Sequence, residues 1–371
     1  MKLKIKNIEL LTALKLISSL TQVSYTSIRS NYIIIRAKKN ILTIIWSSEN
    51  ISGIFNVKNG ITILEEGEAV VKTKIILNLI SKIKDSEIEI SLIDNLLRIE
   101  TKTYTSNINT SNKEILPEIS INTDKWEKIE IDNNIFNLGI KKVQNSSIIH
   151  SEKINKFSGI HIESKPNKNE LRFIATDSYK LSTKKFKSNN LVEINALIKT
   201  STLIQVINYI KLNEKIQLFK SNNELIIQTK DFTLKCPTIS SNFPNIDNLI
   251  EVQGNIKFKA SIKDLLNALE KIVALTNNDK NHTAKMLLNE KNIKLECKNP
   301  DLGNSCEIIE VTTNTKDEFK TSFNALYLID LLKNFDNDLI TFVFNNENSP
   351  FYIVDEKEKD FVQVLMPLVN L

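Results

Sequence analysis

TKIILNLISKIKDSEIEISLIDNLLRIETK, residues 73–102, has the same plan as two later stretches, TSTLIQVINYIKLNEKIQLFKSNNELIIQTK (200–230) and FNALYLIDLLKNFDNDLITFVFNNENSPFYIVD (323–355). Each begins with apolar residues at three- and four-residue steps, passes through a charged turn, and ends in two β-branched runs separated by an Asn-containing turn. The first part is typical of an amphipathic helix and the second of a β-hairpin. Three copies of one helix–strand–strand plan indicate a repeated structural unit.

A second kind of helical segment alternates with the first. It occurs at 7–20, 132–148 and 261–277, and each copy precedes a longer strand-rich stretch. The six helix starts are 60–67 residues apart and lie near Asn7, Thr73, Asn133, Thr200, Ser261 and Phe323. The alternation predicts an α+β chain in which one domain, two helices packed on antiparallel sheets, is used three times. We expect the domains at 1–124, 125–253 and 254–371.

The helical segments are apolar on one side and polar on the other. The apolar positions are Ile8, Leu11, Leu14 and Ile17 in the first segment and Leu265, Leu266, Leu269 and Ile272 in the fifth. The opposite sides carry Lys, Asn, Ser and Thr. For one helix the ordinary interpretation is a solvated surface, but six such helices in register indicate a shared, mildly basic wall. The net charge of +5 supports only weak, non-specific contacts with phosphates.

Composition points to a globular protein of the cytoplasm. Apolar residues make up 41% and charged residues 25% of the 371-residue chain, which is ordinary for a globular domain. No run of 18 apolar residues occurs, so we expect no membrane span and no membrane partner. Cys236, Cys297 and Cys306 are too few and wrongly spaced for a disulfide framework or a zinc site, which favours a reducing compartment.

The sequence contains no recognisable catalytic constellation. Glycines do not form the closely spaced pattern of a phosphate-binding loop, and His150, His161 and His282 lack the spacing of metal ligands. Asp336 and Asp338 lie in the turn after a predicted helix, where paired acids are normally solvated. We therefore expect a protein that is not an enzyme and that holds no metal or cofactor.

One stretch, together with three others, identifies a family. FIATDSYKLS (173–182) resembles the A-T-D-G-H-R-L-A segment of the bacterial DNA polymerase III beta subunit, the replication sliding clamp. FSGI (157–160) resembles that family's L-N-G-[IV], FPN (243–245) resembles its F-P-D, and VLMPL (364–368) resembles its V-V-M-P-M. The matches occur in the family's order, so the resemblance extends over the whole chain.

The resemblance implies a head-to-tail homodimer in which two chains close a six-domain ring around duplex DNA, with helices on the inner wall. It implies a processivity factor of DNA replication that slides without sequence preference. The inner wall would carry Lys15, Lys74, Lys82, Lys141, Lys199, Lys263, Lys271 and Lys333. Tyr104 and Leu275 align approximately with the apolar positions of the subunit interface.

The resemblance also implies a groove that binds short hydrophobic motifs of the Q-L-x-L-F kind, through which the replicative polymerase, the clamp loader and repair polymerases dock. Carried over residue by residue, its lining is Phe157, Thr176, Ser178, Tyr179, Lys180, Leu181, Pro244, Asn248, Leu249, Val364, Met366, Pro367 and Leu368. Ser178 stands where the family has Gly, so this residue is strained if its φ is positive. Tyr179 replaces the usual His, and the chain ends Val369-Asn370-Leu371 without the family's arginine.

Two other functions stay open from the sequence. A DNA-modifying enzyme, such as a nuclease or glycosylase with a basic groove, would need a carboxylate cluster or a base-flipping pocket. Asp177 and Asp336 are the acids that such an enzyme would use. A clamp paralogue without a replicative role would keep the fold and lose the partners.

Overall fold

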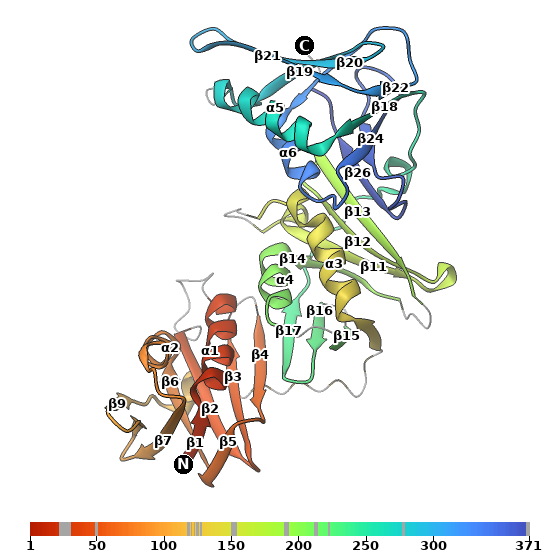
Figure 1. The fold of residues 1–371 in the computed structure, drawn as a ribbon. Coiled ribbons are helices and arrows are strands. Elements are labelled where there is room, and N and C mark those ends of the chain that lie inside the picture. The colour runs from red at the N-terminus through yellow and green to blue at the C-terminus, as the bar shows by residue number, and fades with distance from the viewer. Residues whose placement is uncertain are drawn as a thin grey trace. The chain divides into compact units, whose positions relative to one another are not determined.

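The computed structural model describes residues 1–21, 31–48, 51–116, 128–149, 154–188, 193–210, 214–221, 223–276 and 279–368, with the single residues 119, 121, 123 and 126. The chain order of the elements can be followed from red to blue in Figure 1. Among the described residues, no helix is long and apolar enough to span a membrane.

Six α-helices occur in the described residues, and each begins within two residues of its predicted start. They are α1 (Asn7–Thr21), α2 (Thr73–Lys82), α3 (Asn133–Val143), α4 (Thr200–Ile207), α5 (Ile262–Leu275) and α6 (Ala325–Leu332). A strand leads directly into every helix, which the periodicity did not predict. These strands are β1 (Lys2–Lys6), β6 (Gly67–Lys72), β10 (Lys128–Asp132), β14 (Asn195–Lys199), β18 (Ile256–Ser261) and β23 (Phe319–Asn324). The repeated unit is therefore strand–helix–strand–strand or a longer variant of it.

Polar residues at the strand–helix junctions explain why the helices begin there. The Ser261 hydroxyl accepts from the Asp264 N–H at 3.2 Å, and the Asn324 amide oxygen accepts from the Tyr327 N–H at 3.1 Å. These bonds satisfy backbone donors that the first helical turn leaves unpaired. At the start of α1, the Asn7 side chain instead donates to the Ile83 carbonyl at 2.7 Å, which ties α1 to the end of α2.

The chain divides into two compact units. Unit 1 comprises residues 1–136 and 202–238 and contains two antiparallel sheets. One has the order β5 (Ile61–Glu65), β1, β7 (Glu87–Ile93), β8 (Leu96–Glu100) and β9 (Thr105–Asn109). The other has the order β10, β15 (Lys215–Lys220), β16 (Glu224–Gln228), β17 (Phe232–Pro237), β4 (Ser52–Val57), β3 (Ile41–Ser47), β2 (Tyr32–Lys38) and β6.

Helix α1 corrects one expectation about the core. Leu14 and Ile17 are buried as predicted, but Ile8 is 63% exposed and Leu11 is only partly buried. The helix has two overlapping apolar stripes, and the one that includes Leu10 is buried. Periodicity alone cannot separate such stripes, because both recur at helical spacing.

Unit 2 comprises residues 137–201 and 239–371 and also contains two antiparallel sheets. Its larger sheet has the order β14, β11 (Gly159–Lys165), β12 (Glu170–Thr176), β13 (Lys180–Lys187), β26 (Phe361–Leu365), β25 (Phe351–Val354), β24 (Leu339–Phe344), β18 and β22 (Thr312–Thr313). Its smaller sheet has the order β21 (Gly303–Glu310), β20 (Asn292–Asn299), β19 (Thr283–Leu288) and β23.

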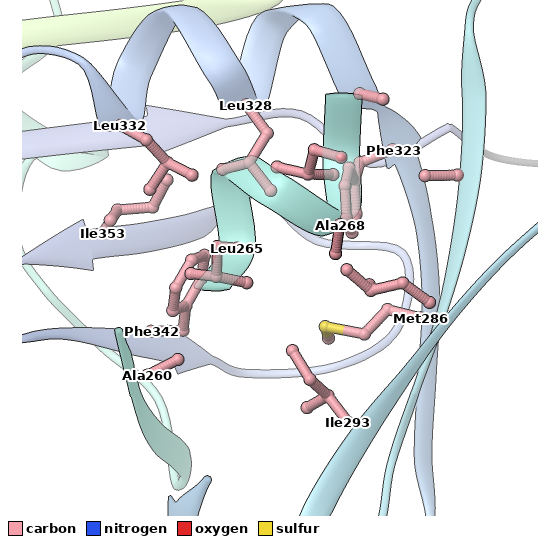
Figure 2. Close-up of a cluster of buried hydrophobic side chains, with 14 of the residues drawn as sticks. Ala260, Leu265, Ala268, Met286, Ile293, Phe323, Leu328, Leu332, Phe342 and Ile353 are labelled. Atoms are coloured by element: carbon pink, nitrogen blue, oxygen red, sulfur yellow. The ribbon is translucent and has the colours of Figure 1, made fainter. Parts of the chain in front are cut away.

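Figure 2 shows the main core of unit 2. Leu265 and Ala268 of α5 and Leu328 of α6 point toward Met286 and Phe342 from the two sheets. These side chains are at most 3% exposed. Burial of each large side chain contributes roughly 1.5 to 3 kcal/mol relative to leaving it in water. The predicted α+β class, with helices packed on antiparallel sheets, is confirmed.

The sheets run across the expected domain limits. In unit 1, β17 pairs with β4, with Phe232 opposite Phe55. In unit 2, β13 pairs with β26, with Lys180 opposite Leu365. The first expected limit, between residues 124 and 125, lies outside the described residues, and both domain limits stay a prediction.

Candidate functional site

Unit 2 contains a pocket of about 200 Å³ formed by four segments that are distant in the sequence. The segments are the short 3₁₀ helix η4 (Lys156–Ser158), the turn between β12 and β13, the loop around the 3₁₀ helix η6 (Asp247–Leu249), and the end of β26. The lining residues are Lys156, Phe157, Thr176, Ser178, Tyr179, Lys180, Leu181, Pro244, Ile246, Leu249, Val364 and Met366.

The structure brings ten of the thirteen predicted groove residues into this one pocket. Asn248, Pro367 and Leu368 do not line it. Leu368 instead lines a separate depression of about 390 Å³, where its backbone N–H donates to the Ser322 carbonyl at 2.7 Å. The chain thus turns away from the pocket after Met366 and continues beside β23. The terminal residues Val369, Asn370 and Leu371 lie outside the described part of the chain.

Two lining residues, Lys156 and Ile246, were absent from the prediction. Each lies next to a matched motif, one before Phe157 and the other two residues after Pro244. Ile246 is 4% exposed and packs with Ile174 in an apolar cluster under the pocket. Neighbouring positions along an irregular segment have no fixed side-chain period, so the motifs alone could not identify them.

The turn between β12 and β13 adopts an unusual backbone conformation. Ser178 has φ of +78°, so the residue that replaces the family's Gly is in the left-handed region. This conformation costs an L-residue about 1 to 2 kcal/mol. The Asp177 carboxylate offsets part of the cost, because it accepts from the N–H groups of Tyr179 and Lys180 at 2.9 and 2.8 Å. Burial raises the pKa of Asp177 despite these two bonds.

Helix α6 supports the same turn from one side. The Lys180 ammonium pairs with Asp330 and lies 5.1 Å from the centre of the Tyr327 ring. The Tyr179 ring stacks on Tyr327 with centroids 5.8 Å apart. Burial and the nearby Asp177 charge raise the pKa of the Tyr327 phenol. An ion pair and an aromatic contact therefore fix the position of one pocket wall.

Sheet pairing explains why residues near both ends of unit 2 share the pocket. β13 pairs with β26 in antiparallel register, which places Leu181 opposite Val364. At the end of this ladder the Met366 N–H donates to the Tyr179 carbonyl at 2.8 Å. Leu181 and Val364 are buried and form the floor, whereas Met366 is 40% exposed at the edge.

A cluster of charges holds the loop that carries Pro244 and Leu249. The Asp247 carboxylate pairs with Arg172 of β12 at 2.7 Å and with Lys165 at 3.1 Å. Hydrogen bonding to Arg172 and Lys165 lowers the pKa of Asp247 to about 2. The Arg172 side chain is only 4% exposed. The loop is thus anchored on its outer side while Leu249, 44% exposed, faces the pocket.

The lining of the pocket is mostly apolar. Its lining contains neither Asp nor Glu, and Tyr179, Leu249 and Met366 leave large apolar surfaces exposed around it. Such a surface in a concave site is typical of an interaction site. In the described residues, no group of three or more His, Cys, Asp or Glu side chains could hold a metal ion.

The two acids of the turn after α6, Asp336 and Asp338, contact other parts of unit 2. Asp336 pairs with the buried Lys142 at 2.9 Å, and Asp338 accepts from the N–H of Lys263 at 3.0 Å at the start of α5. His161 is buried and stacks on Phe243, with centroids 4.6 Å apart. His150 lies outside the described residues.

The predicted DNA-facing lysines are surface residues. Lys15, Lys74, Lys82, Lys141, Lys263, Lys271 and Lys333 are exposed, and Lys199 is half-buried. Lys271 pairs with Glu307 of β21 at 2.9 Å, so part of its charge is neutralised within the chain. Of the two predicted interface residues, Tyr104 is 37% exposed beside β9, whereas Leu275 is partly buried against the core of unit 2.

Comparison with known proteins agrees with this geometry. Two family models match: the DNA polymerase III beta subunit central domain over residues 130–245 and its C-terminal domain over 249–369. The beta sliding clamp of Mycoplasma genitalium is 28% identical over 350 residues, which are 91% of this chain and 91% of that protein. Crystal structures of beta subunits from Streptococcus pyogenes and Thermotoga maritima superpose with TM-scores of 0.92 and 0.90 at 17% and 20% identity, over 100% of both chains.

The repeated helices on antiparallel sheets, together with the four-segment pocket, define a DNA clamp. The chain belongs to the family of bacterial DNA polymerase III beta subunits, the beta sliding clamps. Its function is that of a DNA replication processivity factor, and it is not an enzyme.

Proposed function

We propose that two copies of this chain close head to tail into a ring around duplex DNA, and that the pocket of unit 2 tethers partners to this ring. The partners are the replicative polymerase, the clamp loader and repair polymerases, each docking a short hydrophobic motif. The convergence of four distant segments on one apolar pocket carries this proposal. Met and aliphatic side chains around the pocket can repack against several related peptides.

Two free sheet edges support the head-to-tail contact. In the described residues, β9 is an edge of the five-stranded sheet of unit 1, and β21 is an edge of the four-stranded sheet of unit 2. Tyr104 beside β9 and Ile308 on β21 are 37% and 66% exposed. An uncovered edge strand presents unpaired backbone N–H and C=O groups that invite aggregation, and pairing β9 of one copy with β21 of the other covers both edges. Each copy supplies both edges, so two copies close a ring.

The lysine-bearing helix surfaces support a sliding contact with DNA. B-form DNA carries one negative charge per about 1.7 Å of its axis, so a wall of scattered lysines meets phosphates at every position along the duplex. A net charge of +5 gives a weak field that salt screens readily. The chain is held on DNA by ring closure, and the weak contacts let it move. We place this function in the cytoplasm, where free thiols such as that of exposed Cys306 persist.

Peptide titration tests the tethering proposal. A fluorescent peptide of the Q-L-x-L-F type is titrated with wild-type protein, Met366→Ala and the matched control Leu339→Ala, which truncates an exposed side chain on β24 outside the pocket. We expect saturable binding that Met366→Ala weakens by about 1 to 2 kcal/mol, roughly 5- to 30-fold, and that Leu339→Ala leaves unchanged. Absence of binding at high micromolar concentration would contradict the proposal and favour a paralogue without a replicative role.

A further inference from the structure

The four-stranded sheet of unit 2 carries the depression of about 390 Å³ that Leu368 lines, which we call the sheet depression. It lies over β19, β20 and β23, beside the turn between β24 and β25. Its lining residues are Lys285, Met286, Leu287, Glu296, Lys320, Thr321, Ser322, Glu347, Asn348 and Leu368. The sheet order β21, β20, β19, β23 places it at the side opposite to β21, so the head-to-tail contact proposed above does not involve it.

Strand register gathers three lysines around one apolar residue of this depression. On β19, Met286 points into the core and is 3% exposed, so its neighbours Lys285 and Leu287 lie on the outward face of the sheet. Antiparallel pairing places Lys320 of β23 and Lys294 of β20 opposite Leu287, one on each side. Lys285 lies on the same face two residues before Leu287, about 7 Å away along the strand. Leu287 is therefore the centre of a basic cluster.

Positive charge predominates in this cluster. The Glu296 carboxylate pairs with Lys294, and this hydrogen bond lowers the pKa of Glu296. Lys285 and Lys320 are exposed, and neither forms an ion pair with a described residue. Glu347, in the turn after β24, is the second acid of the lining. Three lysines and two glutamates thus leave excess positive charge around an apolar centre.

We propose that the sheet depression is a second docking site of unit 2, and that its occupant is an acidic segment of a partner protein that also carries an apolar residue. The apolar residue covers Leu287 and Leu368, and neighbouring carboxylates pair with Lys285 and Lys320. In an extended segment, residues two positions apart point to the same side and lie about 7 Å from each other, which is also the spacing of Lys285 from Leu287. This site is independent of the pocket and of the peptide binding proposed for that pocket.

Two other kinds of ligand fit the sheet depression less well. Its lining contains no aromatic ring on which the bases of a nucleic-acid strand could stack. A small inorganic anion would leave Leu287 and Leu368 uncovered. An acidic peptide with an apolar residue matches both the charge and the apolar surface of the site.

Peptides of one shape and different charge test the inference. A fluorescent peptide with the core E-D-L-D-E is titrated with the full chain at low and at high salt. Its twin Q-N-L-N-Q lacks the charges, and E-D-S-D-E lacks the apolar residue. The protein variants are Lys285→Gln, Lys320→Gln and Glu347→Gln. Lys298→Gln is the matched control, because Lys298 is exposed on the same face of β20 but does not line the depression.

We expect saturable binding of E-D-L-D-E that weakens at high salt, and weaker binding of both twins. Each substitution of a lining lysine should lower the affinity about two- to fivefold, since the pairs are open to solvent. Glu347→Gln should raise the affinity about twofold, because it removes a like charge, and Lys298→Gln should leave it unchanged.

Three results would overturn the proposal. The first is absence of saturable binding, or binding that Lys285→Gln and Lys320→Gln leave unchanged. The second is displacement of E-D-L-D-E by unlabelled Q-L-x-L-F peptide, because the acidic peptide would then occupy the pocket. The third is binding that appears only after residues 369–371 are removed, which would make this chain and not a partner the occupant. The Q-L-x-L-F titration is a separate measurement, so either proposal can fail without the other.

Discussion

Asp247 illustrates how a single side chain can position a wall of the pocket. Its carboxylate lies at the surface, 51% exposed, yet it connects the loop that carries Leu249 to the buried Arg172 of β12. Ser178, in the turn between β12 and β13, lowers stability instead, because its left-handed backbone is strained and surrounding contacts have to offset that cost. The shape of the pocket thus depends in part on a residue, Asp247, that does not line it.

We expect Asp247 to make folding pH-dependent. Its pKa is about 2 in the folded chain and about 3.9 in an unfolded one, so its contribution is present above about pH 4 and disappears as pH falls through about 2. Because the carboxylate is half-exposed and screened by solvent, we expect about 1 kcal/mol rather than the full linkage value. Urea unfolding of wild-type protein and Asp247→Asn should differ by that amount at pH 6 and converge near pH 2. A difference that does not change with pH, or one reproduced by Asp301→Asn at an exposed site, would contradict this assignment.

Residue patterns predicted most of the site but not all of it. Of the ten predicted residues that line the pocket, nine lie in the four motifs that carry the family resemblance, and Leu249 lies just beyond one of them. Lys156 and Ile246 were not predicted as lining residues, because side chains in irregular segments do not point in directions that repeat along the sequence. Ile8 was placed on the apolar face of the first helix and is exposed, because two stripes of similar hydrophobicity compete on α1. Packing against the sheets determines which stripe is buried, and this packing involves residues that are distant in the sequence.

At the scale of elements, a set of buried ions joins α3, β13 and the turn between β25 and β26. Lys142 is 3% exposed and pairs with Glu358 at 2.8 Å, and Lys184 of β13 pairs with the same carboxylate at 2.8 Å. The Lys142 ammonium also lies 4.9 Å from the centre of the Phe361 ring. Two lysines share one carboxylate, so the removal of that charge leaves buried Lys184 without this partner and Lys142 with Asp336 alone.

We therefore predict that Glu358→Gln lowers the free energy of unfolding by about 2 to 4 kcal/mol. The value lies toward the lower end of the range for buried pairs, because Glu358 is 18% exposed and Asp336 still neutralises Lys142. Chemical unfolding followed by circular dichroism measures the change. Glu356→Gln is the control: it breaks an ion pair of 2.7 Å with Lys259, but Glu356 is 63% exposed, so we expect less than about 1 kcal/mol. An equal loss of unfolding free energy in the two variants would show that burial of these ions does not determine how much they stabilise the fold.

The helices could be predicted from the sequence more completely than the sheets. All six helices begin near their predicted positions, since helical periodicity is a local property. The strand before each helix and the pairing of β17 with β4 did not follow from the pattern. Strand pairing joins segments that are far apart in the chain, and short apolar runs of similar composition do not specify their partners. The ring follows from the family resemblance alone and stays a prediction, because no local pattern indicates it.

For the whole molecule, the proposed ring depends on a contact between two edge strands of the described residues, β9 and β21. Ile308 projects from edge strand β21 and is 66% exposed, so it is the best position at which to interrupt the proposed contact. Ile308→Asp removes an apolar contact and introduces a charge into the interface, which should weaken each contact by about 2 to 4 kcal/mol. We expect wild-type protein at micromolar concentration to have about twice the 42.4 kDa chain mass by light scattering, and the variant to have the mass of one chain. Leu64→Asp is the matched control, because Leu64 is 53% exposed on β5, a different edge strand.

The same two variants distinguish topological retention from adhesion to DNA. After loading onto nicked circular DNA and gel filtration, wild-type protein and Leu64→Asp should stay with the circle and leave once the circle is cut, because a closed ring can escape only over a DNA end. Ile308→Asp should leave at once, since weak phosphate contacts alone exchange rapidly at physiological salt. Retention of the single-chain variant equal to that of wild-type protein would show that lysine contacts, and not closure, hold the protein on DNA. If Leu64→Asp lost the dimer and Ile308→Asp kept it, the result would indicate that the interface contains β5 and not β21.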